Sequence, residues 1–129
     1  MQTGANFESL AHELTRLLDV GTTASIVRVT IEGTTNDVYF GLREGQLHLD
    51  YWAPGLRGLW YRWRFKCVAA KSGLRVTMEQ WGTKRVARVA TGSKPHEVAG
   101  LAKHFLHELY GAKPGTFLLT IQPWGYSAT

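Results

Sequence analysis

Residues 59–69, LWYRWRFKCVA, decide how the fold of this 129-residue chain is interpreted. Large apolar side chains alternate there with mostly basic ones, and a period of two is typical of a half-buried β-strand. The alternation predicts the longest strand of the protein. One set of side chains would point inward (Tyr61, Trp63, Phe65 and Cys67) and the other set outward (Trp60, Arg62, Arg64 and Lys66).

Two further strands are predicted directly after this segment, over residues 74–81 and 84–90. Two-residue turns at residues 72–73 and 82–83 would pair Met78 with Cys67 on one side and with Ala87 on the other. A slip of one residue would bury the arginines, so this register is favoured over its neighbours. It places Arg75, Trp81 and Arg88 on the outer face, with Lys66 opposite Glu79, Arg64 opposite Trp81 and Thr77 opposite Arg88.

The remaining elements follow from the same two periodicities. Apolar residues at helical spacing predict two helices, over residues 6–19 and 94–110, with Asn6 and Ser93 as N-caps. Alternation predicts strands over 25–32, 38–42, 47–51 and 116–122, while residues 53–58 are expected to form a crossover. A turn at residues 44–45 would pair Phe40 with Leu49.

Together these elements predict an α+β protein that forms a single domain over residues 1–129. It would have an N-terminal helix, about six antiparallel strands, a second helix and a C-terminal strand. Both helices carry an apolar stripe that must be buried, so they are expected to pack on one face of the sheet. The other face would then be open to water.

Charge is distributed unevenly along the chain. Residues 56–90 contain nine basic side chains and one acidic one, a net charge of +8, whereas the rest of the chain has a net charge of −3. An asymmetry of this kind bears on partners and not on fold. The predicted outer face would therefore be basic and would carry exposed tryptophans.

The function expected from this face is binding without catalysis. Arginine and lysine neutralise phosphates and exposed rings stack on unpaired bases, which favours nucleic acid and single strands in particular. The expected binding residues are Trp60, Arg62, Arg64, Lys66, Arg75, Trp81 and Arg88. The main alternative is that the chain is a protein-interaction module, such as an assembly factor, chaperone or inhibitor, that binds an acidic protein. An ordinary solvated strand face would also explain the pattern.

The order of the predicted elements is loosely similar to the class I secretion-chaperone fold, which has a helix, three strands, a crossover and further strands before a last helix. The similarity is one of topology only and includes no sequence motif, so it does not identify a family. The basic segment differs from the acidic character that is usual in those chaperones.

No motif in the sequence names a reaction, and the enzyme interpretation is not favoured. His104 and His107 lie three residues apart beside Glu108, but no other cluster supplies further metal ligands, so no metal or cofactor is expected. Cys67 is expected to be buried and inert. A small enzyme or carrier that uses an internal pocket lined by large aromatic residues is a third possibility.

The single cysteine and the lack of an apolar leader after Met1 predict a cytoplasmic protein without disulfides. No apolar run approaches the roughly 20 residues that cross a bilayer, so no membrane partner is expected. A homodimer that covers the tryptophans would also fit the sequence.

Overall fold

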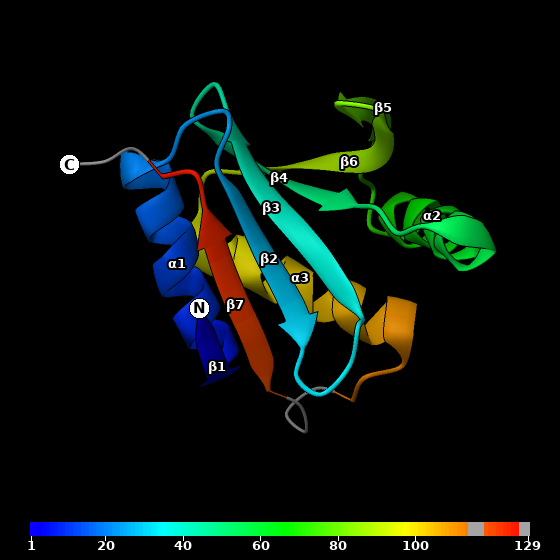
Figure 1. The fold of residues 1–129 in the computed structure, drawn as a ribbon, viewed down its shortest axis with the longest axis horizontal. Helices are drawn as coiled ribbons and strands as arrows, with labels where there is room; N and C mark the ends of the chain where they lie inside the picture. Colours follow the sequence, from blue (N-terminus) through cyan, green and yellow to red (C-terminus); the bar gives the residue numbers. More distant parts are fainter. Residues whose placement is uncertain (114–117, 127–129) are drawn as a thin grey trace.

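The computed structural model describes residues 1–113 and 118–126 of the chain. Within these residues the elements are β1 (Gln2–Ala5), α1 (Phe7–Val20), β2 (Ile26–Ile31), β3 (Asp37–Arg43), β4 (Gln46–Tyr51), α2 (Gly55–Lys71), β5 (Val76–Trp81), β6 (Lys84–Gly92), α3 (Pro95–Tyr110) and β7 (Leu119–Trp124). The strands form one antiparallel sheet in the order β1-β7-β2-β3-β4-β6-β5. Helix α2 lies at the side of the sheet where β4 and β6 are found (Figure 1).

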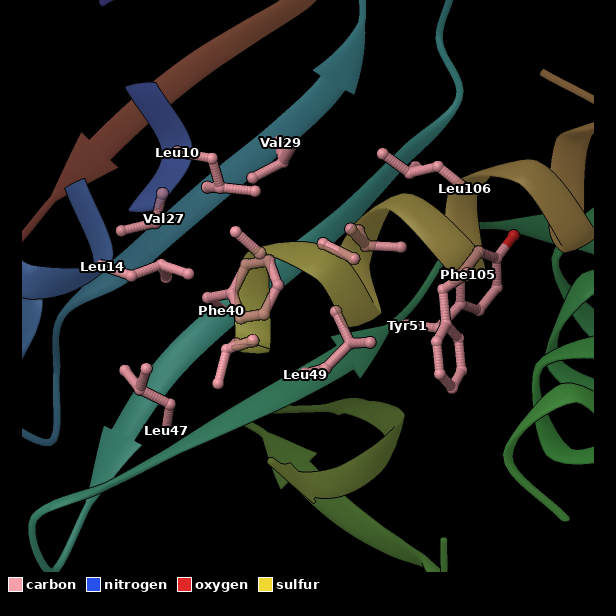
Figure 2. Close-up of a cluster of buried hydrophobic side chains, with 14 of the residues drawn as sticks. Leu10, Leu14, Val27, Val29, Phe40, Leu47, Leu49, Tyr51, Phe105 and Leu106 are labelled. Atoms are coloured by element: carbon pink, nitrogen blue, oxygen red, sulfur yellow. The ribbon is translucent and has the colours of Figure 1, made fainter. Parts of the chain in front are cut away.

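The core lies between α1, α3 and one face of the sheet. Phe40 and Leu49 point from neighbouring strands toward the helices, where they meet Leu14 of α1 and Phe105 of α3 in one cluster of buried residues (Figure 2). All four side chains are almost completely buried, and each contributes about 1.5–3 kcal/mol by leaving water. The predicted α+β class, with helices packed on one sheet face, is therefore confirmed.

Two predicted helices are present with nearly the predicted ends. Asn6 caps α1, and its side-chain oxygen accepts a hydrogen bond from the Ser9 backbone N–H at 2.9 Å. Gly111 ends α3 in the left-handed conformation. Ser93 is not the cap of α3, because Lys94 holds that position and its side chain makes no capping bond.

Two of the three predicted hairpin registers are confirmed. Phe40 pairs with Leu49 across β3 and β4, and Met78 pairs with Ala87 across β5 and β6. Both residues of the first turn, Glu44 and Gly45, have positive φ, as the two-residue hairpin turn of type I′ requires. Strand β1 was not predicted. The start of the predicted strand over 116–122 lies outside the described residues, and its later part belongs to β7.

The predicted strand over residues 59–69 is wrong, because these residues belong to the 17-residue helix α2. The predicted crossover also contains the start of this helix, at Gly55. The predicted pairs of Cys67 with Met78, Lys66 with Glu79 and Arg64 with Trp81 do not form, since β5 pairs only with β6 among the described strands.

Aromatic density explains the wrong assignment. The residues that α2 buries include Gly58, Phe65, Val68 and Ala69, which follow helical spacing. Large rings also occupy the positions between them, so the same stretch satisfies a period of two. Both periodicities fit, and only the packing distinguishes them.

Helix α3 supplies the contacts that select the helical form. The Phe65 and Phe105 rings lie 5.0 Å apart, as do the rings of Tyr61 and Tyr110. Arg64 donates from Nε to the backbone oxygen of Glu108 at 2.8 Å. These partners are 40 or more residues away in sequence, so no local pattern reveals them.

Candidate interaction surface on helix α2

The seven predicted binding residues are distributed over three parts of the structure. Trp60, Arg62, Arg64 and Lys66 lie on α2, and Trp81 and Arg88 lie on β5 and β6, while Arg75 immediately precedes β5. The expectation of one continuous platform on the open sheet face is therefore wrong.

Two arginines on the outer sheet face, Arg28 and Arg88, are paired with carboxylates. Arg88 donates from Nε and Nη2 to the two carboxylate oxygens of Asp50, at 2.8 and 3.0 Å. Arg28 donates from Nε to Asp37 Oδ2 at 2.8 Å. Because both arginines are already paired, neither of them is a free cation on this face.

Burial shifts the pKa values of two groups in and beside these pairs. Desolvation raises the pKa of Asp37, and the Arg28 guanidinium opposes that effect. Desolvation, with the nearby Asp37 charge, raises the pKa of Tyr39 to about 12. These shifts are the signature of a half-buried polar layer and not of an open, solvated strand face.

Helix α2 itself exposes an unusual amount of apolar surface. Leu56 is 84% exposed, Leu59 and Trp60 are each 51% exposed, and Trp63 is 59% exposed. These residues recur at intervals of three and four, so they form a second stripe on the side of the helix opposite its buried one. We call these four residues the apolar stripe of α2.

Basic side chains flank the apolar stripe, and α2 contains no acidic residue. No carboxylate of the described residues lies within ion-pair distance of any of them. Two of them lie against rings instead, with Arg57 4.8 Å from the centroid of Tyr61 and Arg64 5.6 Å from that of Trp60. The five are Arg57, Arg62, Arg64, Lys66 and Lys71.

A cavity of about 600 Å³ adjoins the start of the apolar stripe. It lies between the first turns of α2 and the β5–β6 turn, and its apolar lining includes Trp52, Leu56 and Leu59. Basic lining comes from Arg62, Lys84 and Arg85, with no acidic residue among the lining residues. Lys84 Nζ lies 4.3 Å from the Trp52 ring centroid, so a cation stands directly over an apolar wall.

The cysteine and the histidine pair singled out in the sequence have ordinary surroundings. Cys67 was expected to be buried beside Met78 but is half-buried on α2. His107 Nδ1 lies 2.6 Å from the backbone oxygen of Ala112, just beyond the end of α3. Among the described residues, no group of three or more His, Cys, Asp or Glu side chains could hold a metal ion.

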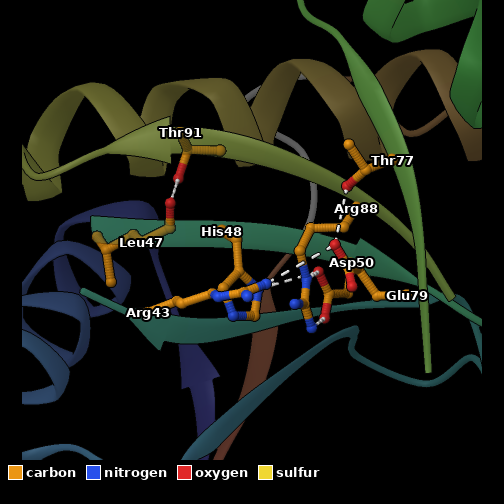
Figure 3. A network of polar contacts seen from close by, with 8 residues as sticks. All are labelled: Arg43, Leu47, His48, Asp50, Thr77, Glu79, Arg88 and Thr91. Carbon is orange, nitrogen blue, oxygen red and sulfur yellow. Dashed lines mark hydrogen bonds and ion pairs between the residues drawn. The ribbon is translucent and has the colours of Figure 1, made fainter. Parts of the chain in front are cut away.

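The sequence interpretation missed a polar cluster on the outer face of β4 and β6 (Figure 3). His48 and Asp50 come from β4, and Arg88 comes from β6, with His48 Nδ1 3.0 Å from Asp50 Oδ1. The alternation did place His48 and Asp50 on one face. The missing signal was the pairing of β4 with β6, which brings Arg88 directly opposite Asp50.

No protein-family model matches this chain, and neither the curated proteins nor the solved structures contain a significant match. Within the described residues, no helix has the length and apolar character needed to span a bilayer. The function of the chain must therefore be inferred from its own surfaces.

Proposed function

We propose that this chain is a non-enzymatic binding domain whose helix α2 docks on an acidic protein segment. One observation carries the proposal: an exposed apolar stripe is flanked by five cations that have no carboxylate partner among the described residues. Isolated exposed apolar residues are normal, but a contiguous patch rimmed by charge is typical of an interaction site.

The spacing of the apolar stripe supports a protein partner. Residues at i, i+3, i+4 and i+7 are the anchors by which a helix binds an apolar groove or another helix. Trp60 and Trp63 belong to the residue type most enriched among interface hot spots. Leu59 is 51% exposed, so burial of the remaining part of its side chain in an interface would contribute about 1 kcal/mol.

The charges favour an acidic partner over a second copy of the same surface. Two α2 helices that met face to face would bring ten cations together without a single carboxylate from either helix. Like charges placed across an interface cost several kcal/mol. An acidic segment with apolar side chains would instead pair with the flanking cations while it covered the stripe.

Single-stranded nucleic acid is the second candidate, because Trp63 offers an exposed ring beside basic residues. Leu56 and Leu59 argue against it as the main ligand, since an aliphatic side chain offers no π-face for a base. Trp60 is also partly occupied, with Arg64 over its ring and Tyr61 at 4.8 Å.

The test compares defined probes on the purified chain by fluorescence anisotropy. The probes are a helical peptide with Glu and Leu on opposite faces, a scrambled peptide of the same composition, a thymidine oligonucleotide and anionic phospholipid vesicles. The amphipathic peptide should bind at least about tenfold tighter than its scramble, because only the former presents a continuous apolar face to the stripe. Equal affinity for all four probes would mean that charge alone binds, which contradicts the proposal.

Three variants assign the binding to α2. Leu59→Glu with Trp63→Glu should abolish peptide binding, because it places charges in the apolar stripe. Arg62→Glu with Lys66→Glu should weaken binding and flatten its salt dependence. Arg16→Glu with Lys94→Glu makes the same charge change on residues outside α2, and it should leave binding within about twofold.

The nucleic-acid alternative has its own signature in the same assay. Oligonucleotide affinity would fall with salt at a log–log slope of about −0.7 per phosphate contacted, so about four contacts give a slope near −3. A tight oligonucleotide complex that Arg62→Glu with Lys66→Glu abolishes, with no peptide binding, would replace the protein partner by nucleic acid.

A further inference from the structure

A second cavity, of about 510 Å³, lies on the outer face of the sheet, away from α2. The edge strand β5 reaches back over this face, although β6 and β4 separate it from β3 in the sheet. The Trp81 ring meets Tyr39 edge-on at 5.0 Å, and Glu79 lies 3.8 Å from Arg43. These contacts close one side of a groove whose floor contains His48.

A β-bulge orients this histidine. The pairing of β4 with β6 changes register between Leu47 and His48, where Thr91 is the extra residue of β6. The Thr91 hydroxyl donates to the Leu47 backbone oxygen at 2.9 Å and holds the bulge in place. Gly41 lies opposite His48, and a Cβ at Gly41 would stand only 2.3 Å from His48 Cε1, so the ring occupies the space that a side chain would need.

Only one nitrogen of His48 has a partner among the described residues. Nδ1 lies 3.0 Å from Asp50 Oδ1, and the neutral ring must carry its hydrogen there, because the carboxylate of Asp50 accepts (Figure 3). Nε2 is then left with a lone pair and no donor from the described part of the chain. His48 is 9% exposed and lines the groove, so a ligand in the groove can reach the ring.

The charges of the groove constrain its ligand. Asp50 and Glu79 balance Arg43 and Arg88 among the lining residues, so these four side chains together carry no net charge. An anion would find no unbalanced cation here. A neutral ligand that both donates and accepts hydrogen bonds fits, and the Trp81 indole adds an apolar wall.

We propose that this groove binds a small neutral polyhydroxylated molecule, a monosaccharide or polyol. One hydroxyl donates to His48 Nε2, neighbouring oxygens accept from the guanidinium groups of Arg43 and Arg88, and the C–H face lies against Trp81. The cavity volume is within the range of small-molecule sites, and a monosaccharide with ordinary ligand efficiency would bind with a Kd on the order of a few mM.

The experiment is a titration of the ¹⁵N-labelled full chain, followed by NMR, with D-glucose, D-mannose and myo-inositol. Inorganic phosphate and acetate serve as charged comparisons. At least one sugar or polyol should give saturable shifts at the His48 ring nitrogens and the Trp81 indole N–H. No saturable shift from any of the three, or tighter binding of phosphate or acetate, would overturn the proposal.

Variants distinguish the site from adventitious binding. His48→Phe removes the acceptor and should raise the Kd at least about tenfold, whereas His12→Phe changes a solvent-exposed histidine of α1 and should leave the Kd unchanged. If His48→Phe proves unfolded, the wild-type shifts still decide, because they must cluster at His48, Trp81 and their neighbours. Shifts confined to α2, or an unchanged Kd in a folded His48→Phe variant, would refute the assignment.

Discussion

Removal of the Arg88 guanidinium is expected to destabilise the protein far more than the loss of an ordinary ion pair. Asp50 is completely buried, and among the described residues Arg88 is its only cationic partner apart from the titratable His48. In Arg88→Met the carboxylate stays buried without its bidentate partner, which typically costs 3–5 kcal/mol. For a domain of this size, that cost corresponds to a fall in Tm of about 10–20 °C.

The chain contains a matched control for this prediction. Arg43 and Glu79 also form an ion pair between strands, but at 3.8 Å and with side chains 61% and 32% exposed. Pairs of this kind contribute about 0–1 kcal/mol, so Arg43→Met should shift the urea midpoint only slightly. The comparison isolates burial, because the substitution and the face of the sheet are the same.

A double variant tests the physical reason. Asp50→Asn keeps an acceptor for His48 but removes the charge, so Asp50→Asn with Arg88→Met leaves no buried ion without a partner. The double variant should be more stable than Arg88→Met alone, with a coupling energy of about 2 kcal/mol in equilibrium urea unfolding. If Arg88→Met costs no more than Arg43→Met, or if the two single changes simply add, desolvation of the Asp50 carboxylate is not the main cause of the lost stability.

Three further outcomes are expected. Gly41→Ala should cost about 1–3 kcal/mol in urea unfolding, because its Cβ would displace the His48 ring; the same change in a His48→Ala background should cost little, and an equal cost in both would refute the clash. The pKa of Tyr39 is raised from 10.0 to about 12, so the folded state holds the phenolic proton more tightly than the unfolded chain. This shift contributes about 1–2 kcal/mol to the free energy of unfolding, once solvent screening of the half-buried group is included. The contribution is complete below pH 10 and is lost as the pH rises through 12. Tyr39→Phe should therefore flatten the fall of the free energy of unfolding between pH 10 and 12, and an unchanged pH dependence would contradict the assignment. Tyr110→Phe removes a 2.8 Å hydrogen bond to the Asp37 backbone oxygen and should lower the free energy of unfolding by about 0.5–1.5 kcal/mol, whereas an undiminished value would show that the bond contributes nothing.

Much of the candidate interaction surface could be predicted by residue but not by geometry. Trp60, Arg62, Arg64 and Lys66 were singled out because aromatic and basic residues interleave there, and they do lie together on one element. Their separation from Arg88 could not be predicted, since it depends on whether residues 59–69 form a strand or a helix. The sequence is also compatible with a helix, since Gly58, Tyr61, Phe65 and Val68 have intervals of three, four and three.

The sequence by itself determined the elements whose specification is local. The β3–β4 and β5–β6 hairpins have the predicted registers because a two-residue turn and strict alternation act on the same few residues. The amphipathic helix α1 was likewise predictable from its apolar stripe and its Asn6 cap. In these elements, propensity, pattern and capping all agree.

Only the tertiary structure decided the form of α2 and the His48–Asp50–Arg88 cluster. Residues 59–69 satisfy both periodicities, so contacts of Phe65 with Phe105 and of Tyr61 with Tyr110 select the helix. The cluster exists because β4 pairs directly with β6, although α2 and β5 lie between them in the sequence. This pairing brings Arg88 to the Asp50 carboxylate, 38 residues away in the chain. Both outcomes depend on burial between segments that are distant in sequence, and no local pattern carries that information.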